Sequence, residues 1–350
     1  MPDKVVKVKH QIDSVQMDVD FSEDEAKYKT TQLRHRQPSD PVSCSPTGTI
    51  MRMESSFANP ITPELAAALM PRRADDSFKG SFGKVLVVAG SKKYTGAAGL
   101  AIQAALRSGS GLVFAAIPEC IHTPLAAIIS EAIWLTLPCR EGAISAEAAA
   151  QIPEMLAGKD AVLVGPGLSQ TEGTQIFLLG LLSRLQFHAP DLPLVLDADA
   201  LNLVSQQPAW QKLLPRQTIL TPQEMEFSRL TGLGLDEIHS NRLNLAAAYA
   251  QNWRQTLILK GPNTLVVSPA GDCRVLPFSN SVLAHGGTGD VLAGLIVGLL
   301  AQGLAPFDAA SLAVWLHAKA AELALAAVGH AAATLPSDII NHLGKAMSSL

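Results

Sequence analysis

Short, continuous apolar runs that end in glycine or polar loops constrain the fold of this chain more than any other feature of its sequence. One of them, "KVLVVAGS", is apolar at consecutive positions, which is typical of a strand buried on both faces. Similar runs recur in "AVLVGPG", "LVLDADA", "TILTPQE" and "LILKGPN", with helical segments between them. Strands that alternate with helices predict an α/β fold, with a mostly parallel sheet covered by helices on both faces.

Several helices are expected from their sequence signals. "TPELAAALMP" begins with Thr62, a favourable N-cap, and places Pro63 at the first helical position, where a missing N–H costs nothing. In "LILKGPNTLVVSPAGDCRVLPF", two turns link short β-runs. Longer helices are predicted over residues 171–186, 242–253, 291–302 and 307–327, the last two closing the chain.

The first 58 residues differ in character from the rest of the chain. They are polar, with mixed charges and no sustained periodicity, so they bury too little apolar surface to offset their chain entropy. We expect residues 1–58 to be a disordered or poorly ordered extension. Residues 59–350 are expected to form one domain, and a chain that starts near Asn59 is expected to keep its stability and activity. The 48% hydrophobic content of the 350 residues is enough for a sizeable core.

Charge and cysteine content exclude several classes of partner. A net charge of −4 argues against nucleic acid or an anionic membrane surface as the main partner. The apolar run 291–301 is too short to cross a bilayer, so no membrane segment is expected. The four cysteines form no CxxC pair, zinc spacing or dense disulfide framework, which favours a cytoplasmic location.

The loop "HGGTGD" precedes a strongly apolar helix. Its glycines leave backbone N–H groups bare, and the helix N-terminus adds partial positive charge, so the pair can cradle a phosphate. A phosphate beside Asp290 would raise the pKa of its carboxyl group, and the carboxylate could then take a proton from a hydroxyl group. On local grounds an alternative stays open, in which Asp290 only caps the helix and the glycines form a tight turn.

Other loops at strand ends carry polar or small residues. Lys260 can reach a nucleotide phosphate as a point charge, although a surface lysine in a hairpin turn gives the same local pattern. Asp197 and Asp199 can bind Mg²⁺ through water or cap the next helix. Gly96–Ala97 and Gly165–Gly167 admit a flat ligand close to the backbone, or serve only as turns. Because parallel strands end at one edge of a sheet, these loops predict a shared ligand site.

Taken in order, these loops resemble one family. "KGSFGKVLVVAGSKKYTGAAG", "VGPGL", "VLDADALN", "LTPQEMEF", "LKGPNT" and "GGTGDVLAGLI" are similar to motifs of the ADP-dependent (S)-NAD(P)H-hydrate dehydratases, which belong to the ribokinase-like superfamily. The resemblance covers about residues 60–345. It implies a ribokinase-like three-layer fold and a hydro-lyase that repairs NADH and NADPH hydrated on the nicotinamide ring. The family phosphorylates the ring hydroxyl with ADP (ATP in eukaryotic relatives), and AMP and phosphate are released.

The resemblance also assigns roles to residues. Asp290 would be the catalytic base, and Ala97, Gly167 and Asp290 would contact the hydrated nucleotide. Mg²⁺ would accompany ADP, with no protein ligand assigned to it. The family further implies a homotetramer, and a separate NAD(P)H-hydrate epimerase in the same pathway, because the N-terminal segment is too short for a fused epimerase domain. The residues that would contact ADP or AMP are Lys260, Gly261, Pro262, Asn263, Thr264 and Gly289.

Three departures from the family pattern and two alternative functions remain. Gln223 stands where the family usually has His, with Glu226 in place; Ser169 replaces a glycine; and the usual Pro-Gly after Asn280 is absent. A ribokinase-like kinase of a small alcohol, such as a thiazole or pyrimidine precursor, would share the phosphate loop but release a stable phosphorylated product. A non-catalytic nucleotide-binding sensor is the second alternative, and Asp290 with its complete glycine loop argues against it.

Overall fold

The computed structural model describes residues 6–12, 15–21 and 58–350, which fall into two units divided between Thr49 and Ile50. In the first unit, β1 (Val6–Ile12) and β2 (Val15–Phe21) pair as antiparallel strands. The remainder of the predicted N-terminal extension lies outside the described residues, so its disorder stays a prediction.

Removal of the first unit is expected to leave the second unit intact. The first strand of the large sheet begins at Ala58, one residue before the predicted domain boundary, and it pairs in parallel with a strand near residue 274. A chain that lacks residues 1–49 keeps this strand whole. We therefore expect its melting temperature and its activity to equal those of the full chain. A thermal melt followed by circular dichroism checks this, and a loss of several degrees would show that the first unit stabilises the second.

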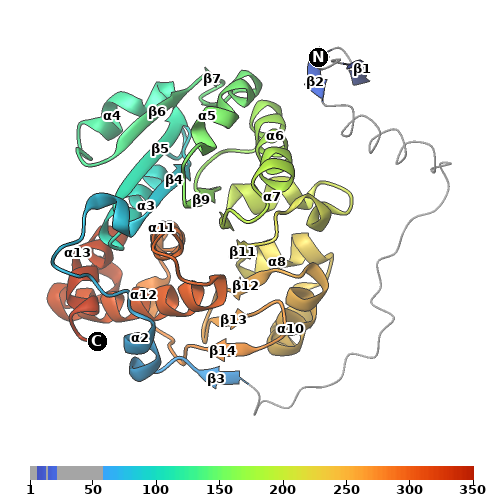
Figure 1. The fold of residues 1–350 in the computed structure, drawn as a ribbon. Coiled ribbons are helices and arrows are strands. Elements are labelled where there is room, and N and C mark those ends of the chain that lie inside the picture. The colour runs from blue at the N-terminus through green and yellow to red at the C-terminus, as the bar shows by residue number, and fades with distance from the viewer. Residues whose placement is uncertain (1–5, 13–14, 22–57) are drawn as a thin grey trace. The chain divides into compact units, whose positions relative to one another are not determined.

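A ten-stranded, mostly parallel sheet forms the centre of the second unit (Figure 1). Seven neighbouring strands, β12 to β6 in spatial order, run parallel, whereas β13 is antiparallel to both of its neighbours. The predicted α/β sheet is therefore confirmed. In spatial order the strands are β3 (Ala58–Pro60), β14 (Cys273–Val275), β13 (Leu265–Val267), β12 (Thr256–Leu259), β11 (Thr218–Leu220), β10 (Leu194–Leu196), β9 (Ala161–Val164), β4 (Lys84–Val88), β5 (Leu112–Pro118) and β6 (Ile133–Leu137).

Helices cover both faces of the sheet (Figure 1). One face carries α2 (Pro63–Leu69), α3 (Thr95–Arg107), α4 (His122–Ala126), α11 (Thr288–Ala301), α12 (Pro306–Val328) and α13 (Pro336–Met347). The other carries α5 (Ile152–Leu156), α6 (Glu172–His188), α7 (Asp199–Ser205), α8 (Glu224–Thr231), α9 (Leu235–Ser240) and α10 (Arg242–Trp253). The short elements are the hairpin β7 (Cys139–Arg140) and β8 (Ala143–Ile144), and the 3₁₀ turns η2 (Lys79–Phe82), η3 (Glu119–Ile121), η4 (Ala146–Gln151), η5 (Trp210–Leu213), η6 (Ser281–Leu283) and η7 (Ala331–Ala333).

The two faces of the sheet explain why the strands are apolar throughout. In β4, Val85 and Val87 join the core beneath α3 and α11, whereas Leu86 and Val88 join the core beneath α6 and α7. Successive side chains of a strand point to opposite faces, so a strand covered on both sides needs apolar residues at every position. The continuous runs in the sequence follow from this double burial.

Most of the predicted helices are present, with small differences at their ends. Thr62 caps α2 by accepting a hydrogen bond from the backbone N–H of Leu65 at 3.2 Å, as predicted. The sequence analysis did not predict β6 or α13. β6 is an edge strand, and most of its side chains are at least partly exposed although its sequence, IWLTL, is largely apolar. The closing helix α13 follows α12 after a short connection and buries Ile339, Ile340 and Leu343.

Helix α12 is long and apolar enough to cross a bilayer by length and composition alone. In the fold, 61% of its most apolar 18-residue window is buried inside the protein. Its buried residues belong to the same core as those of α11 and α13. A helix that is apolar on most of its surface is expected in the core of a large domain. The composition of α12 is therefore explained by packing.

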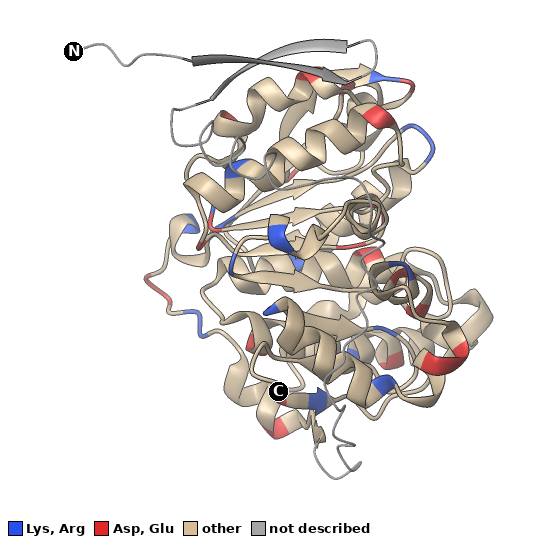
Figure 2. Ribbon diagram, turned by 90° about the vertical axis from the view of Figure 1, so that its right-hand side faces the viewer, with Lys and Arg blue, Asp and Glu red and all other residues tan. Residues whose placement is uncertain are grey.

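The charged residues are interspersed in sign. Figure 2 shows Lys and Arg alternating with Asp and Glu over the helices and loops of the face in view. This agrees with the near balance of 27 basic and 31 acidic residues in the chain.

Candidate active site

The glycine and polar loops singled out in the sequence follow strands that are neighbours in the sheet. β12, β11, β10, β9 and β4 lie side by side and run parallel, so their carboxyl ends share one edge. Ligands of open α/β sheets bind at this edge. The predicted common edge is confirmed by the strand order. In that order the loops are 260–264, 221–223, 197–199, 165–170 and 89–94.

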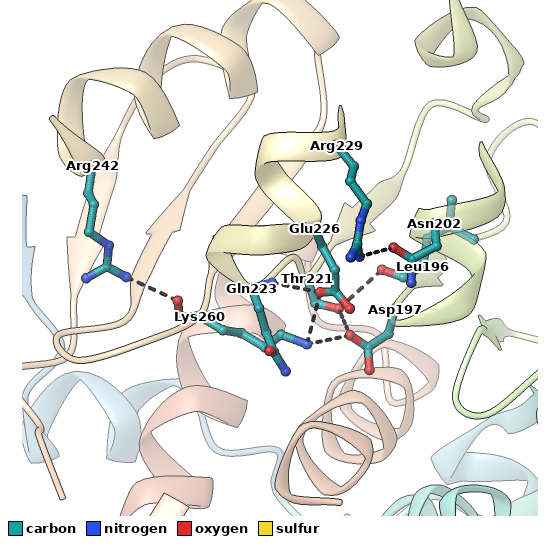
Figure 3. Close-up of polar contacts among 9 residues, drawn as sticks. All are labelled: Leu196, Asp197, Asn202, Thr221, Gln223, Glu226, Arg229, Arg242 and Lys260. Carbon is teal, nitrogen blue, oxygen red and sulfur yellow. Dashed lines mark hydrogen bonds and ion pairs between the residues drawn. The ribbon is translucent and has the colours of Figure 1, made fainter. Parts of the chain in front are cut away.

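Lys260, at the end of β12, is the cation at the centre of this edge (Figure 3). Its side chain is only 12% exposed, and its Nζ lies 2.6 Å from Oδ1 of Asp197 and 3.9 Å from Oε2 of Glu226. Burial alone would lower the pKa of Lys260, but these two carboxylates raise it above its ordinary value. Lys260 is therefore a buried, charged lysine, and the interpretation as a surface lysine in a turn is wrong.

Asp197 and Asp199 are two residues apart but bind different partners. Asp197 accepts hydrogen bonds from Lys260 and, at 2.7 Å, from the Thr221 hydroxyl. Asp199 accepts a hydrogen bond from the backbone N–H of Ser169 at 2.8 Å. It accepts a second one from the side-chain amide of Gln170. Asp197 thus holds the cation, whereas Asp199 fastens the loop after β9.

The two carboxylates diverge because the residue between them has an unusual backbone conformation. Ala198 has φ 50° and ψ −118°, a region that favours glycine. Such strain costs about 1–3 kcal/mol and persists at functional sites because the surroundings impose it. Ala198→Gly is therefore expected to increase the free energy of unfolding by about 1 kcal/mol, since relief of strain exceeds the extra chain entropy of glycine. Urea denaturation measures this, and an unchanged or lower stability would contradict the assignment of strain.

Asp290 lies at the third position of α11, and Gly287, with φ 101°, occupies the N-cap. Asp290 therefore does not take the capping position that the local alternative required. Burial raises the pKa of Asp290 to about 7; the Asp197 carboxylate adds to the shift, and Lys260 opposes it. A carboxyl group with this pKa is half ionised near neutral pH and is suited to general-base chemistry.

Gly289, the second residue of α11, lies near the Lys260 amine. A Cβ built on Gly289 would be 3.5 Å from Nζ of Lys260. The predicted phosphate loop and the predicted nucleotide-binding lysine, which lie on different elements, are thus brought together. Both the backbone N–H groups of a helix N-terminus and a lysine amine favour an anion at this place.

The two small residues expected to contact the substrate are also adjacent. Gly167 has φ 61°, and a Cβ built on it would lie 2.9 Å from Cβ of Ala97 and 2.6 Å from Cβ of Tyr94. Any larger residue at 167 would collide with the start of α3. The loops after β4 and β9 are further joined by a hydrogen bond of 2.9 Å between the hydroxyl groups of Ser169 and Ser91.

Gln223 and Glu226 begin α8 beside Lys260 (Figure 3). The backbone N–H of Gln223 donates a hydrogen bond to Oε2 of Glu226 at 2.8 Å. Gln223 is exposed to solvent. Burial and the Asp197 carboxylate raise the pKa of Glu226, while the charge of Lys260 lowers it. Glu226 therefore belongs to the buried charge cluster, and Gln223 lies at its solvent side.

The sequence analysis missed His317, in α12. The side chain is buried, and its Nε2 has no hydrogen-bond partner among the residues that the structure describes. Burial and the charge of Lys260 lower the pKa of His317 to about 4. A hydrogen bond to the backbone of Thr288 acts in the opposite direction and raises it. The ring is therefore neutral and lies next to the phosphate loop. A single histidine in an apolar helix carries no motif, so the sequence held no signal for it.

No group of three or more His, Cys, Asp or Glu within the described part of the chain is arranged to hold a metal ion by itself. The site does offer carboxylate oxygens at Asp197 and Glu226, which are ligands that Mg²⁺ accepts. These side chains suit a Mg²⁺ ion that is bound mainly by the phosphate groups of a ligand. They do not suit an ion whose ligands all come from the protein.

Comparison with known proteins gives consistent results. The profile of a family described as NAD(P)H-hydrate dehydratase matches residues 85–345. The chain is 37% identical, over 83% of its length and 54% of that protein's, to the bifunctional NAD(P)H-hydrate repair enzyme Nnr of Moorella thermoacetica. It is 36% identical, over 75% of its length and 88% of that protein's, to the ADP-dependent (S)-NAD(P)H-hydrate dehydratase of Bacillus subtilis. The chain thus spans about half the length of the bifunctional relatives it matches.

Solved structures share the fold. A ribokinase-like superfamily protein of Enterococcus faecalis aligns with a TM-score of 0.72 and 26% identity, covering 85% of this chain and 98% of that one. The ADP/ATP-dependent NAD(P)H-hydrate dehydratase of Bacillus subtilis, co-crystallized with ATP/Mg²⁺, aligns with a TM-score of 0.71 and 30% identity, covering 83% and 98%. The ribokinase-like fold expected from the sequence is confirmed.

Proposed function

The chain belongs to the NAD(P)H-hydrate dehydratase family, and from this premise we propose that it restores NADH and NADPH by ADP-dependent dehydration of the S-epimer of their hydrates. One observation carries the proposal. Asp290, whose pKa is about 7, lies in the first turn of α11, directly after Gly289, where an added Cβ would be 3.5 Å from the Lys260 amine. A base and an anion cradle side by side are what transfer of a phosphoryl group to a hydroxyl requires.

In the proposed reaction, Asp290 accepts the proton of the hydroxyl group on the hydrated nicotinamide ring. The hydroxyl oxygen attacks the β-phosphorus of ADP, and the bond from that phosphorus to AMP breaks. Phosphate then leaves the ring carbon, a proton is lost from the adjacent carbon, and the ring double bond re-forms. The balance is one hydrate and one ADP consumed, with one NAD(P)H, one AMP and one phosphate released. The N–H groups of residues 287–289 would hold the phosphoryl group during transfer.

The two halves of the edge suit the two substrates. We assign the hydrated nucleotide to Ala97, Gly167 and Asp290, because the contact between the loops after β4 and β9 leaves small side chains there. The adenine nucleotide is assigned to residues 260–264 and Gly289, because Lys260 begins this loop and its amine lies near Gly289. Mg²⁺ would enter on the phosphates of ADP and supply charge neutralisation, with Asp197 and Glu226 reaching it through water.

The setting of the reaction is also proposed. From the family resemblance we propose a separate NAD(P)H-hydrate epimerase in the same pathway, and the naming of the longer relatives as bifunctional repair enzymes supports this. We further propose a cytoplasmic location, from the scattered cysteines, and a homotetrameric assembly, from the family resemblance.

One assay tests the function directly. The purified protein is mixed with S-epimer NADH hydrate, ADP and Mg²⁺, and the absorbance of the reduced nicotinamide is followed. We expect the absorbance to return, with AMP and phosphate formed in equal amounts, and no change with the R-epimer or without ADP. A stable phosphorylated product from a thiazole or pyrimidine alcohol, with no repair of the hydrate, would instead support the kinase alternative. Binding of ADP without any turnover would support the sensor.

The pKa of Asp290 predicts how the rate depends on pH. A general base acts only when it is ionised, and its pKa in the free protein is about 7. We therefore expect kcat/KM to rise about tenfold per pH unit at acid pH and to level off above about pH 7. Initial rates between about pH 5.5 and 8.5 measure this. A flat profile over that range would contradict the assignment of Asp290 as the base.

A further inference from the structure

Arg242, the first residue of α10, forms hydrogen bonds with the backbone of the loop that contains Lys260 (Figure 3). Its side chain is 16% exposed, and its two terminal nitrogens donate only to backbone carbonyl oxygens of that loop and of the strand before it. The three acceptors and their distances are Pro262 at 2.5 Å from Nη1, and Lys260 at 3.2 Å and Leu259 at 3.4 Å from Nη2.

A carboxylate holds the remaining side of the guanidinium group. Nε of Arg242 lies 3.1 Å from Oε1 of Glu224, the first residue of α8. Burial lowers the pKa of Arg242, and Glu224 opposes that shift by supplying the counter-charge. The contact of Nε with Glu224 is an ion pair without a hydrogen bond among the described residues, whereas the two terminal nitrogens donate to the loop and strand carbonyls. The guanidinium group is therefore directed at the loop backbone and at Glu224.

The loop conformation depends on this contact. Gly261 has φ 138°, and a Cβ built on it would lie 2.9 Å from Nη2 of Arg242. Only glycine permits so close an approach in this backbone region. The carbonyl groups of the loop are turned toward Arg242, and this orientation fixes the peptide planes of a segment whose tip is exposed to solvent.

Lys260 is held at both ends by this arrangement. Its carbonyl oxygen accepts from Arg242, and its amine binds Asp197 and faces Glu226. Helix α8 supplies Glu224 to the arginine and Glu226 to the lysine, so its first turn and the loop form one charged unit. A displacement of the loop backbone would therefore also displace the Lys260 amine.

We propose that Arg242, held by Glu224, is a positioning residue that keeps residues 260–264 in the conformation that binds the adenine nucleotide. The inference rests on the nucleotide site assigned in the proposed function. Arg242 would act through the loop without touching the nucleotide. Lysine cannot replace it, because a single ammonium group cannot serve three carbonyls and a carboxylate in the fixed planar fork of a guanidinium group.

The test is ADP affinity by calorimetry, measured on the full chain with ADP and Mg²⁺ and without hydrated NADH. Arg242→Lys and Arg242→Gln are each expected to weaken ADP binding by about 10- to 100-fold. KM for ADP should rise to a similar extent, while kcat at saturating ADP and the acid limb of the pH profile change little. A purely structural arginine would lower stability without this selective change in KM.

Two further variants make the test sharp. Glu224→Gln keeps every hydrogen bond to the loop carbonyls but removes the counter-charge, and should weaken ADP binding in the same direction by a smaller factor. If Arg242→Gln does not fold, the ADP affinity of Glu224→Gln tests the positioning role by itself. Arg216→Gln removes an exposed arginine–carboxylate pair with Asp191, whose side chains are 79% and 70% exposed, and should leave ADP affinity unchanged.

The outcomes separate this inference from the proposed function. Unchanged ADP affinity in folded Arg242→Gln and Glu224→Gln variants would overturn the positioning role, whether or not the protein repairs hydrated NADH. A wild-type protein that binds ADP and loses affinity on these substitutions, yet repairs no hydrate, would overturn the proposed function alone. A wild-type protein that binds no ADP would overturn both.

Discussion

Asp290→Asn is expected to lower kcat by about 10²–10⁴ while the melting temperature and the affinity for ADP stay close to those of the wild type. The substitution keeps the size of the side chain and removes its basicity. Asp290 is not the N-cap of α11, so no capping interaction is lost. The pKa of Asp290 is raised to about 7 by burial, so its ionised form is disfavoured in the fold, and a neutral amide at this position should not destabilise the protein.

The matched control for this variant is Asp236→Asn, an exposed aspartate in the first turn of α9. It makes the same chemical change at a similar helical position, and should leave the rate unchanged. Single-turnover rates of hydrated NADH repair and thermal melts of both variants provide the comparison. A folded Asp290→Asn protein that repairs hydrated NADH at nearly the wild-type rate would reject Asp290 as the base.

Lys260→Ala is expected to have the largest effect on stability. It leaves Asp197, with a side chain only 2% exposed, and Glu226, at 12%, without their cation. Loss of one partner of a buried ion pair costs about 3–5 kcal/mol of unfolding free energy. If Lys260 also contacts a phosphate, ADP binding should weaken by about 1.5–3 kcal/mol. The pKa of Glu226 is raised by burial and lowered by the charge of Lys260, so loss of that charge raises it further. The loss of stability should therefore be largest at neutral pH and shrink in acid, where Glu226 becomes protonated.

Urea denaturation and calorimetry measure the two effects separately. Lys319→Ala is the control, because Lys319 is paired with Glu322 on the surface, with side chains 34% and 47% exposed. A change within about 0.5 kcal/mol is expected there. Wild-type stability together with wild-type ADP affinity in Lys260→Ala would contradict the central place given to this lysine.

The local structure of this protein was predictable from local signals. The strands could be found because double burial demands unbroken apolar runs, and α2 because Thr62 and Pro63 are start signals that act within one turn. Residues 242–253 coincide with α10. The edge strand β6 was not predicted, although its sequence, IWLTL, is largely apolar.

The site was predictable in composition but not in geometry. Which loops carry the polar residues follows from the sequence, since each lies directly after a strand. That Lys260 is buried against Asp197, 63 residues away, depends on the order β12, β11, β10 in the sheet. The sequence therefore left Lys260 open between a surface turn and a ligand contact, and only its burial decided between them.

The sequence by itself determined most of the strand and helix segments, the sheet edge that carries the loops, and the residue types available there, because burial pattern and turn chemistry act between neighbours in the chain. Only the tertiary structure decided that Asp197 and Asp199 diverge at Ala198, that His317 lies next to the phosphate loop, and that Arg242 holds the loop backbone. These contacts join elements far apart in the chain, and their energies depend on distances and desolvation that strand order sets. No local pattern contains that information.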